Sequence, residues 1–419
     1  MDQAAQNKTG YKPTMIIGGG MAGITAAVEL AEVGRDVLLV EKLPYLGGKV
    51  AGMNEYFPKL CPPWCGLEIN FKRIRNNPRI RVMQDTVVEK ISGDPGDFTV
   101  SLSSAPELVT PACTACGDCS EVCPVLTPDP FNYGMSMRKA IALPHELAFP
   151  SRFHIDAYAC KKEECNQCVD ACKYNAINLG ARPRKQEISA THIIICTGWE
   201  PFDAARLKDM SWGKSPDIIS NVMMERMGAP NGPTGGKFIR PSDHQPARSV
   251  AFIQCAGSRD ENHQRYCSAV CCSASLKQAL CFIRQDKENR ADIFYIDLRV
   301  TGRNEDFLER VREKEQVRLI KGKPVKVETR GDKLRVEVED ILSGKKIHDN
   351  YDLVVLATGI TPTIPGLEGI RTDEDGFIDK MQLPGGFSAG GCCIDPKDVA
   401  YTVRESTGLI INALNKNRE

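Results

Sequence analysis

Short apolar runs that alternate with glycine-rich or polar segments are the main pattern along the chain. The runs Thr14–Ile17 and Val37–Val40 predict strands, and the small-residue stretch between them, ending at Leu30, predicts a helix. The same pattern predicts further strands, and one further helix at Ala274–Ile283. The strands are Ile193–Ile195, Ser249–Gln254, Ile293–Leu298, Val325–Glu328, Leu334–Val338 and Val354–Leu356. Strands that alternate with helices indicate an α/β fold.

A glycine-rich turn joins the first strand to the first helix. Gly18 allows the turn, Gly20 lets the backbone approach a pyrophosphate, and Gly23 permits close packing of the helix on the strand. The N-terminus of the helix then faces the phosphates. Glu41 ends the second strand, where a carboxylate accepts hydrogen bonds from ribose hydroxyls. A lone GxGxxG is often only a turn, but strand, helix and acid at these offsets predict a dinucleotide site.

A second glycine pair favours FAD over NAD at this site. Gly47-Gly48 follows the acid closely and resembles the extended fingerprint of FAD-binding proteins with two dinucleotide-binding domains. Two strands that end in Thr-Gly support that choice, because the chain must cross near the cofactor there. The complete set of predicted flavin contacts is Gly18, Gly20, Gly23, Glu41, Lys42, Gly47, Gly48, Lys49, Thr197, Gly198, Thr358, Gly359, Gly390 and Gly391.

The composition adds one unusual number, 18 Cys in 419 residues. The 54 basic residues equal the 54 acidic ones, which removes the electrostatic reason to expect nucleic acid as the main partner. The polar N-terminal stretch does not resemble a secretory signal, so disulfides are not favoured, and no apolar run approaches the roughly 18 residues of a membrane span. We therefore expect a cytoplasmic protein whose grouped cysteines bind metal.

Eight cysteines form two runs that are typical of bacterial ferredoxins. Three cysteines of such a run bind one [4Fe-4S] cluster, and the fourth binds the cluster of the other run. This exchange assigns Cys113, Cys116, Cys119 and Cys172 to one cluster, and Cys123, Cys160, Cys165 and Cys168 to the other. A pair of zinc sites is the alternative, and it would need two separated cysteine pairs per ion. The longer spacing after Cys160 is a departure from the pattern.

A third cysteine group follows the strand at Ser249–Gln254, where two-domain flavin reductases carry a nicotinamide site. No GxGxxG turn stands there. The chain instead has Cys255, Cys267, Cys271 and Cys272, the last two at the head of the predicted helix, where thiolates are favoured. We interpret the group as ligands of a third [4Fe-4S] cluster; the alternative is a set of small buried residues.

These features divide the chain into three predicted domains. Residues 1–104, 189–247 and 352–419 form a discontinuous FAD-binding domain, and residues 105–188 form an inserted 2[4Fe-4S] ferredoxin. Residues 248–351 form a second nucleotide-like domain that lacks the NAD motif. The predicted fold is that of a thioredoxin-reductase-like flavoprotein with a ferredoxin insert.

Several long stretches resemble the family of heterodisulfide reductase A subunits: CAGSRDENHQRYCSAVCC, NGPTGGKFIRPSD, IFYIDLR and FSAGGCCIDPKDVAYTVRESTG. The resemblance implies FAD, an atypical cluster at the third cysteine group and no nicotinamide site. It also implies that Lys277 lies by the flavin, with a solvated helix lysine as the alternative. Cys61 and Cys65 match a cysteine-rich stretch of the family, but plain thiols are the simpler interpretation.

The outline of the chain is shorter than that of the methanogen proteins and resembles the A subunit of the quinone-interacting membrane-bound oxidoreductases of sulfate reducers. That resemblance implies peripheral membrane association through two partner subunits, one a related flavoprotein and the other a haem-bearing membrane protein, which link menaquinol to adenylylsulfate reductase. Three alternatives remain open: an electron-bifurcating heterodisulfide reductase subunit, an NAD(P)H-dependent reductase, and a structural subunit with an inert flavin.

Overall fold

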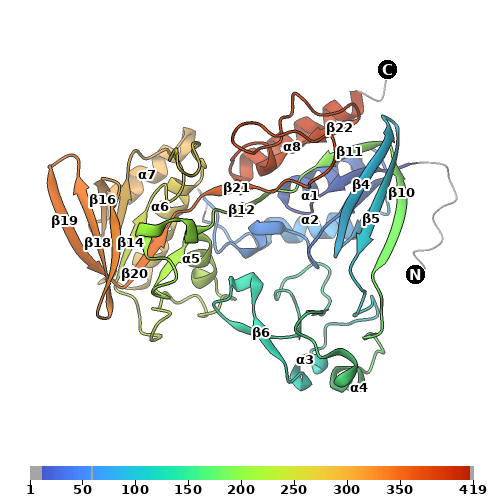
Figure 1. Ribbon diagram of the computed structural model, residues 1–419, viewed down its shortest axis with the longest axis horizontal. Coiled ribbons are helices and arrows are strands. Elements are labelled where there is room, and N and C mark those ends of the chain that lie inside the picture. The colour runs from blue at the N-terminus through green and yellow to red at the C-terminus, as the bar shows by residue number, and fades with distance from the viewer. Residues whose placement is uncertain (1–11, 58–59, 416–419) are drawn as a thin grey trace.

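The computed structural model describes residues 12–57 and 60–415. Two parallel five-stranded sheets form two lobes side by side, and the cysteine-rich segment lies against them (Figure 1). The antiparallel pair of β12 (Trp199–Pro201) and β21 (Ile360–Pro362) carries the chain between the lobes. None of the helices in these residues combines the length and the apolar character that crossing a membrane requires.

The first lobe is built on a sheet with the strand order β22-β11-β1-β2-β3. All neighbouring strands in it are parallel, and the central strands are buried because both faces are covered. Three helices cover one face, and they are α1, α2 and α8. The bounds are β1 Thr14–Ile17, β2 Val37–Val40, β3 Ile80–Met83, β11 His192–Ile195, β22 Phe387–Ala389, α1 Met21–Glu32, α2 Trp64–Asn76 and α8 Val399–Asn415.

A three-stranded antiparallel sheet covers the opposite face of the first lobe. Its strands are β4 (Thr86–Asp94), β5 (Asp97–Ser104) and β10 (Arg184–Ala190). Alternation along β1 explains the two layers, because Met15 packs toward this sheet while Ile16 packs toward the helices.

The second lobe repeats the parallel architecture with the order β13-β20-β14-β15-β16. A smaller antiparallel sheet, β17-β18-β19, packs on it. The bounds are β13 Ile218–Ser220, β14 Ser249–Ile253, β15 Arg290–Tyr295, β16 Val317–Lys321, β17 Lys326–Arg330, β18 Lys333–Asp340, β19 Lys345–Tyr351, β20 Leu353–Leu356, α5 Asn221–Gly228, α6 Cys271–Gln285 and α7 Glu305–Arg312.

Two strands differ from the domain limits expected from the sequence. β13 and β20 fall within 189–247 and 352–419, which the sequence assigned to the FAD-binding domain, yet both belong to the second sheet. The reason is pairing: β20 lies between β13 and β14, so the chain completes the second sheet before β21 returns it to the first lobe.

The insert leaves the first lobe after β5 and returns at β10, and it is mostly loop. Two short helices, one in each cysteine run, pack on each other around a small core of cysteines and apolar side chains. The elements are α3 Asp118–Val122, α4 Gln167–Ala171, β6 Leu126–Pro128, β7 Met137–Lys139, β8 Ile141–Ala142 and β9 His154–Ile155.

Candidate functional site

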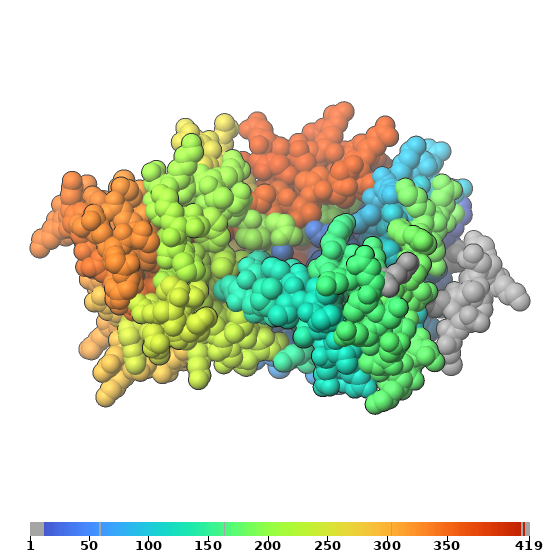
Figure 2. All heavy atoms as spheres, turned by 60° about the horizontal axis from the view of Figure 1, so that its bottom comes forward, coloured from blue at the N-terminus to red at the C-terminus, as the bar shows by residue number. Residues whose placement is uncertain are grey.

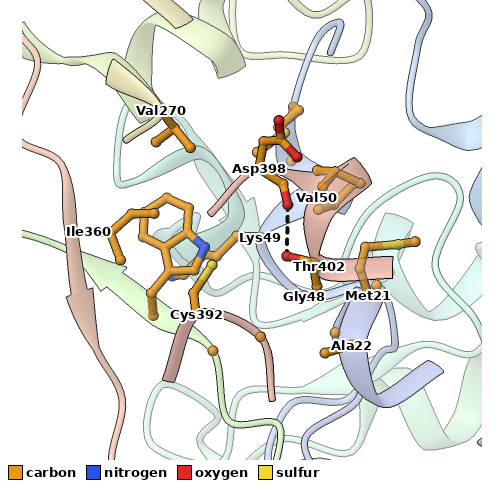
Figure 3. A pocket seen from close by; sticks show the side chains of 18 of the residues that line it. Met21, Ala22, Gly48, Lys49, Val50, Val270, Ile360, Cys392, Asp398 and Thr402 are labelled. Atoms are coloured by element: carbon orange, nitrogen blue, oxygen red, sulfur yellow. Dashed lines mark hydrogen bonds between the residues drawn. The ribbon is translucent and has the colours of Figure 1, made fainter. Parts of the chain in front are cut away.

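A cavity of about 450 Å³ opens between the two lobes, beyond the carboxyl ends of the strands of the first sheet. Ligands of open α/β sheets bind at this edge. Figure 3 shows Val270 and Ile360 on one side of the cavity, and Met21 and Ala22 of α1 on the other. Val270 belongs to the second lobe, and Ile360 belongs to β21, the strand that returns the chain to the first lobe. Both lobes therefore contribute to the walls of the cavity.

Most of the flavin contacts predicted from the sequence line this cavity. They come from the turn before α1, the end of β2, the glycine pair and the loops after β11 and β22. The lining positions are Gly18, Gly20, Glu41, Lys42, Gly47, Gly48, Lys49, Thr197, Gly198, Gly390 and Gly391. Lys277 lines the cavity as well.

Three predicted contacts lie elsewhere. Gly23 packs α1 on the turn, since a Cβ there would stand 1.8 Å from the Gly18 carbonyl oxygen. Thr358 is fully buried and donates a hydrogen bond to Asn221 Oδ1 at 3.4 Å, and Gly359 packs against the hydroxyl of Ser268. The Thr-Gly pair follows β20 of the second sheet, which explains why it lies outside the cavity lining.

Gly20 provides the most informative test of fit for a dinucleotide. Its φ of −78° is open to any residue, and a Cβ added there would meet no protein atom within 4 Å. Neither backbone strain nor packing therefore requires glycine at a position that lines the cavity. The N-cap of α1 has no side-chain hydrogen bond and the first turn has no acidic residue. The backbone N–H groups of the first turn of α1 are therefore open to a ligand, and they suit a pyrophosphate that approaches closely.

Glu41 lies at the end of β2 with 6% of its surface exposed. Its carboxylate accepts hydrogen bonds from the backbone N–H groups of Gly19 at 2.6 Å and Leu43 at 2.8 Å. Burial raises its pKa, while these two hydrogen bonds lower it. A carboxylate has about four lone-pair sites, so it retains the capacity to accept from ribose hydroxyls.

Charged side chains of both signs line the cavity in equal number: Lys42, Lys49, Lys277 and Lys397, and Glu41, Glu200, Glu225 and Asp398. Lys42 lies 3.8 Å from Glu200, and Lys49 also pairs with Glu200. The helix α8 begins at the cavity, where Asp398 caps it by accepting from the Tyr401 N–H at 2.7 Å. The N-terminus of this helix contributes a partial positive charge.

Lys277 is buried, and its Nζ forms an ion pair with Glu225 Oε1 at 2.5 Å. Gln278 donates to the same carboxylate oxygen at 2.6 Å, and the Asn54 N–H donates to the other at 3.0 Å. The alternative of a solvated helix lysine is therefore wrong for this side chain. Lys277, Glu225 and Gln278 all line the cavity, so a buried ion pair forms part of its wall.

Sequence reasoning missed several lining residues. Glu225 lies on α5 among the methionines Met223, Met224 and Met227 and beside Arg226, and nothing local identifies Lys277 as its partner. Cys392 lines the cavity from the Gly390 loop, and its thiol donates toward the Lys397 carbonyl oxygen at 3.5 Å. Burial raises the pKa of Cys392 to about 11.

The structure brings together the two sets of four cysteines that the ferredoxin pattern pairs. One small cavity is lined by Cys123, Cys160, Cys165 and Cys168. A second is lined by Cys113, Cys116, Cys119 and Cys172. In each set the fourth cysteine comes from the other run. No three His, Cys, Asp or Glu side chains in the described residues converge on a single-ion position. A cubane uses a wider cage, because four irons stand between the sulfurs.

Backbone amides point at sulfurs of both sets. The Lys162 N–H donates to Cys160 Sγ at 3.3 Å, and the Ala176 N–H donates to Cys172 Sγ at 3.4 Å. Burial, followed by the nearby thiols Cys113 and Cys116, raises the pKa of Cys119 to about 12. Crowded cysteines, some of whose sulfurs accept backbone N–H groups, suit an iron–sulfur cluster, whose potential depends on such hydrogen bonds.

The third cysteine group also gathers in space, around the turn between β14 and α6. The Cys271 thiol is buried beside Cys272, Cys255 and Cys267, and burial first, then these neighbours, raise its pKa. The Ala269 N–H donates to Cys267 Sγ, and the Arg299 N–H to Cys272 Sγ, both at 3.4 Å. The residues present fit a third cluster.

Cys61 and Cys65 lie near Tyr56, beside the cavity but outside its lining. Burial, followed by these two thiols, raises the pKa of Tyr56, which itself lines the cavity.

The two parallel sheets with a cavity between them are the arrangement of flavoproteins with two dinucleotide-binding domains, and residues 14–93 match the family described as FAD dependent oxidoreductase. The chain is a homologue of heterodisulfide reductase A subunits over about 95% of its length. It is 40% identical to the A subunit of a ferredoxin/F420H2-dependent CoB-CoM heterodisulfide reductase of Methanosarcina acetivorans, over 96% of this chain and 53% of that one.

A second relative is the A subunit of a H2:CoB-CoM heterodisulfide,ferredoxin reductase of Methanothermobacter marburgensis, 33% identical over 95% of this chain and 63% of that one. The chain thus spans about half to two thirds of the length of these relatives. Among solved structures, thioredoxin reductases of T. acidophilum and Lactococcus lactis superpose with TM-scores of 0.55 and 0.54. The first covers 97% of this chain and 99% of its own, the second 97% and 98%, at 14% and 15% identity. They confirm the thioredoxin-reductase-like fold.

Proposed function

We propose that the chain is the flavin- and iron–sulfur-containing electron-transfer subunit of a multi-subunit complex of the heterodisulfide reductase type. FAD would occupy the cavity between the lobes, two [4Fe-4S] clusters the insert, and a third the group at Cys255. The observation that carries the proposal is the cavity lining: Gly20, a glycine that neither packing nor backbone strain requires, stands on one wall, and a buried Lys277–Glu225 ion pair on the other.

Bound FAD would supply a centre that takes up two electrons and can pass them on one at a time to one-electron carriers. The residues of the chain have three tasks around it. The α1 N-terminus and the glycine turns hold the phosphates, Glu41 holds the ribose, and Lys277 places a positive charge by the ring system. Glu225 balances that charge, so the ion pair sets how strongly the cavity favours a reduced, negatively charged flavin.

The comparisons favour the heterodisulfide alternative over the quinone-linked assignment. The quinone-linked assignment, with menaquinol, a haem-bearing membrane subunit and adenylylsulfate reductase, rested on the outline of the chain, whereas the relatives are named as subunits of heterodisulfide reductases. The name of the Methanothermobacter marburgensis relative includes both a heterodisulfide and a ferredoxin. We therefore extend the proposal to electron bifurcation, in which one donor reduces two acceptors of different potential.

An anaerobic reductive titration of the full chain tests the proposal. Stepwise dithionite should bleach the flavin absorbance and produce the paramagnetic signals of reduced [4Fe-4S] clusters. NADH and NADPH should leave the flavin oxidised, because the second lobe carries a cysteine group where the nucleotide turn would stand. Flavin bleaching by either nucleotide would instead support the NAD(P)H-dependent reductase. Unchanged absorbance throughout would support a purely structural role and contradict the proposal.

A further inference from the structure

The loop that carries the third cysteine group has a strained backbone. Three of its residues other than glycine, Cys255, Arg259 and Ala269, have left-handed φ angles of 55°, 54° and 59°. L-amino acids adopt this conformation at an energetic cost, and such strain gathers at functional sites. Cys255 is a proposed cluster ligand, and the Ala269 N–H donates to the sulfur of another, Cys267, at 3.4 Å. Arg259 is the strained residue that the proposed ligand set does not use.

The Arg259 side chain is held beside the third cysteine group. Its backbone N–H donates to the Tyr266 carbonyl oxygen at 3.0 Å, which closes the turn that presents the side chain. The guanidinium forms an ion pair with Asp297. The carbonyl oxygen of Asp297 in turn accepts from the Cys272 thiol at 3.9 Å. The ion pair therefore places a positive charge next to the proposed ligands.

A second arginine is held by the same carboxylate. Arg299 Nε lies 3.3 Å from Asp297 Oδ2. Both guanidinium groups act on thiols of the group. Burial raises the pKa of Cys255, and the Arg259 guanidinium opposes that shift. Asp297, followed by Cys267, raises the pKa of Arg299. Two positive charges and one negative charge thus stand at the third group.

The third group also adjoins the flavin cavity. Val270, directly before Cys271, is part of the cavity wall, as Figure 3 shows. In Figure 2 the teal part of the insert lies against the light-green segment of the second lobe that contains α5. This helix packs against α6, which begins at Cys271. A cluster in the third group would therefore border the flavin cavity, in the lobe on which the insert lies.

We propose that Arg259 and Arg299, with Asp297 as the positioning residue between them, raise the reduction potential of the third cluster. A cluster gains one negative charge when it takes up one electron, so guanidinium groups at its ligands stabilise the reduced form. One positive charge is left in excess, because Asp260, the next carboxylate in the loop, pairs with Lys323 at 2.9 Å. The inference rests on the proposed function, since it assumes a cluster in the third group. Its consequence is that an electron from reduced flavin passes to this cluster more readily.

The test is the midpoint potential of the third cluster in the full reconstituted chain, followed by electron paramagnetic resonance during a redox titration. The signal that Cys255→Ser abolishes identifies this cluster. Arg259→Met should weaken the preference for the reduced cluster about tenfold, a fall of about 59 mV for a one-electron couple. Arg259→Lys keeps the charge and should retain most of the wild-type potential. A wild-type potential in Arg259→Met, or an equal fall in Arg259→Lys, would overturn the proposal.

Arg248→Met is the matched control. Arg248 forms an ion pair with Asp286 in the same lobe, as Arg259 does with Asp297. It precedes β14, however, and so lies at the end of that strand opposite to the third cysteine group. Its replacement should leave the potential unchanged. A fall equal to that of Arg259→Met would show that the effect is not local and would contradict the proposal.

A second variant covers a failure of Arg259→Met to assemble the third cluster. Arg299→Met then decides by the same titration, because a fall is expected and an unchanged potential would contradict the proposal. Failure of the proposed function would look different, since the wild-type chain would then give no signal that Cys255→Ser removes, and both claims would fall together. Failure of the inference alone would leave that signal in place, at a potential that neither arginine changes.

Discussion

Replacing Gly20 by alanine separates the role of a bound dinucleotide from the role of the fold. The Gly20 backbone conformation suits alanine, and the new methyl group would meet no protein atom within 4 Å. The apo protein should therefore lose less than about 1 kcal/mol of unfolding free energy, the scale of a changed N-cap. The methyl group would instead stand where the pyrophosphate approaches the α1 N-terminus.

The expected loss of FAD affinity follows from the contacts displaced. One hydrogen bond from a backbone N–H to a charged group contributes about 1.5–3 kcal/mol, so Gly20→Ala should weaken FAD binding about 10- to 100-fold. Gly23→Ala is the matched comparison, because its Cβ would stand 1.8 Å from the Gly18 carbonyl oxygen. That variant should destabilise the apo protein by about 1–3 kcal/mol through overpacking.

The assay combines two measurements on each variant. Quenching of flavin fluorescence on titration into apo protein gives the dissociation constant, and the thermal midpoint of the apo protein gives stability. Suppose that Gly20→Ala bound FAD as tightly as the wild type, and that the apo forms of this variant and of the wild type had the same thermal midpoint. The phosphates would then not lie against this turn, and the assignment of the cavity would fail.

Three further changes test other parts of the account. Cys123→Ser should remove about four irons per chain, one cubane, while Cys281→Ser, outside every proposed ligand set, should remove none; equal iron in both variants would contradict a ligand role for Cys123. Cys255→Ser should likewise lower iron by about four if the third group holds a cluster, and an unchanged iron content would reduce that group to buried thiols. Burial, followed by Arg226, lowers the pKa of His145 from 6.5 to about 4. The unfolded state therefore binds more protons between those values, and stability should fall as pH drops through about 6.5 to 4, by roughly 3 kcal/mol in total. His145→Phe should lack this component, and parallel pH profiles of apparent unfolding free energy for the two proteins would contradict it.

Local patterns were enough to predict much of the fold. The strands at 14–17 and 37–40 have the predicted bounds, because a short apolar run between a glycine turn and polar residues allows few alternatives. The cysteine sets of the insert were also predictable, since the spacing of each run determines which three sulfurs share a loop and sends the fourth away.

What the sequence could not provide were contacts that depend on how the lobes pack. The strands at 218–220 and 353–356 belong to the second sheet because of their pairing. No local property of their residues indicates to which sheet they belong. The same holds for Thr358 and Gly359, whose Thr-Gly pattern matches that of Thr197 and Gly198 although only the latter pair lines the cavity.

Polar residues at the junction of the insert and the lobes show this limit of sequence-based prediction most clearly. Arg226 and its partner Asn132 are 94 positions apart, and each looks like an ordinary surface residue in the sequence. Only the docking of the insert buries them together, so their contact follows from tertiary structure alone.

The central claim is tested most directly by counting the cofactors of the intact chain after anaerobic purification or reconstitution. We predict about one FAD and about twelve irons per chain, which is three cubanes of four irons each. A chain that folds and yet retains neither flavin nor iron under those conditions would contradict the account.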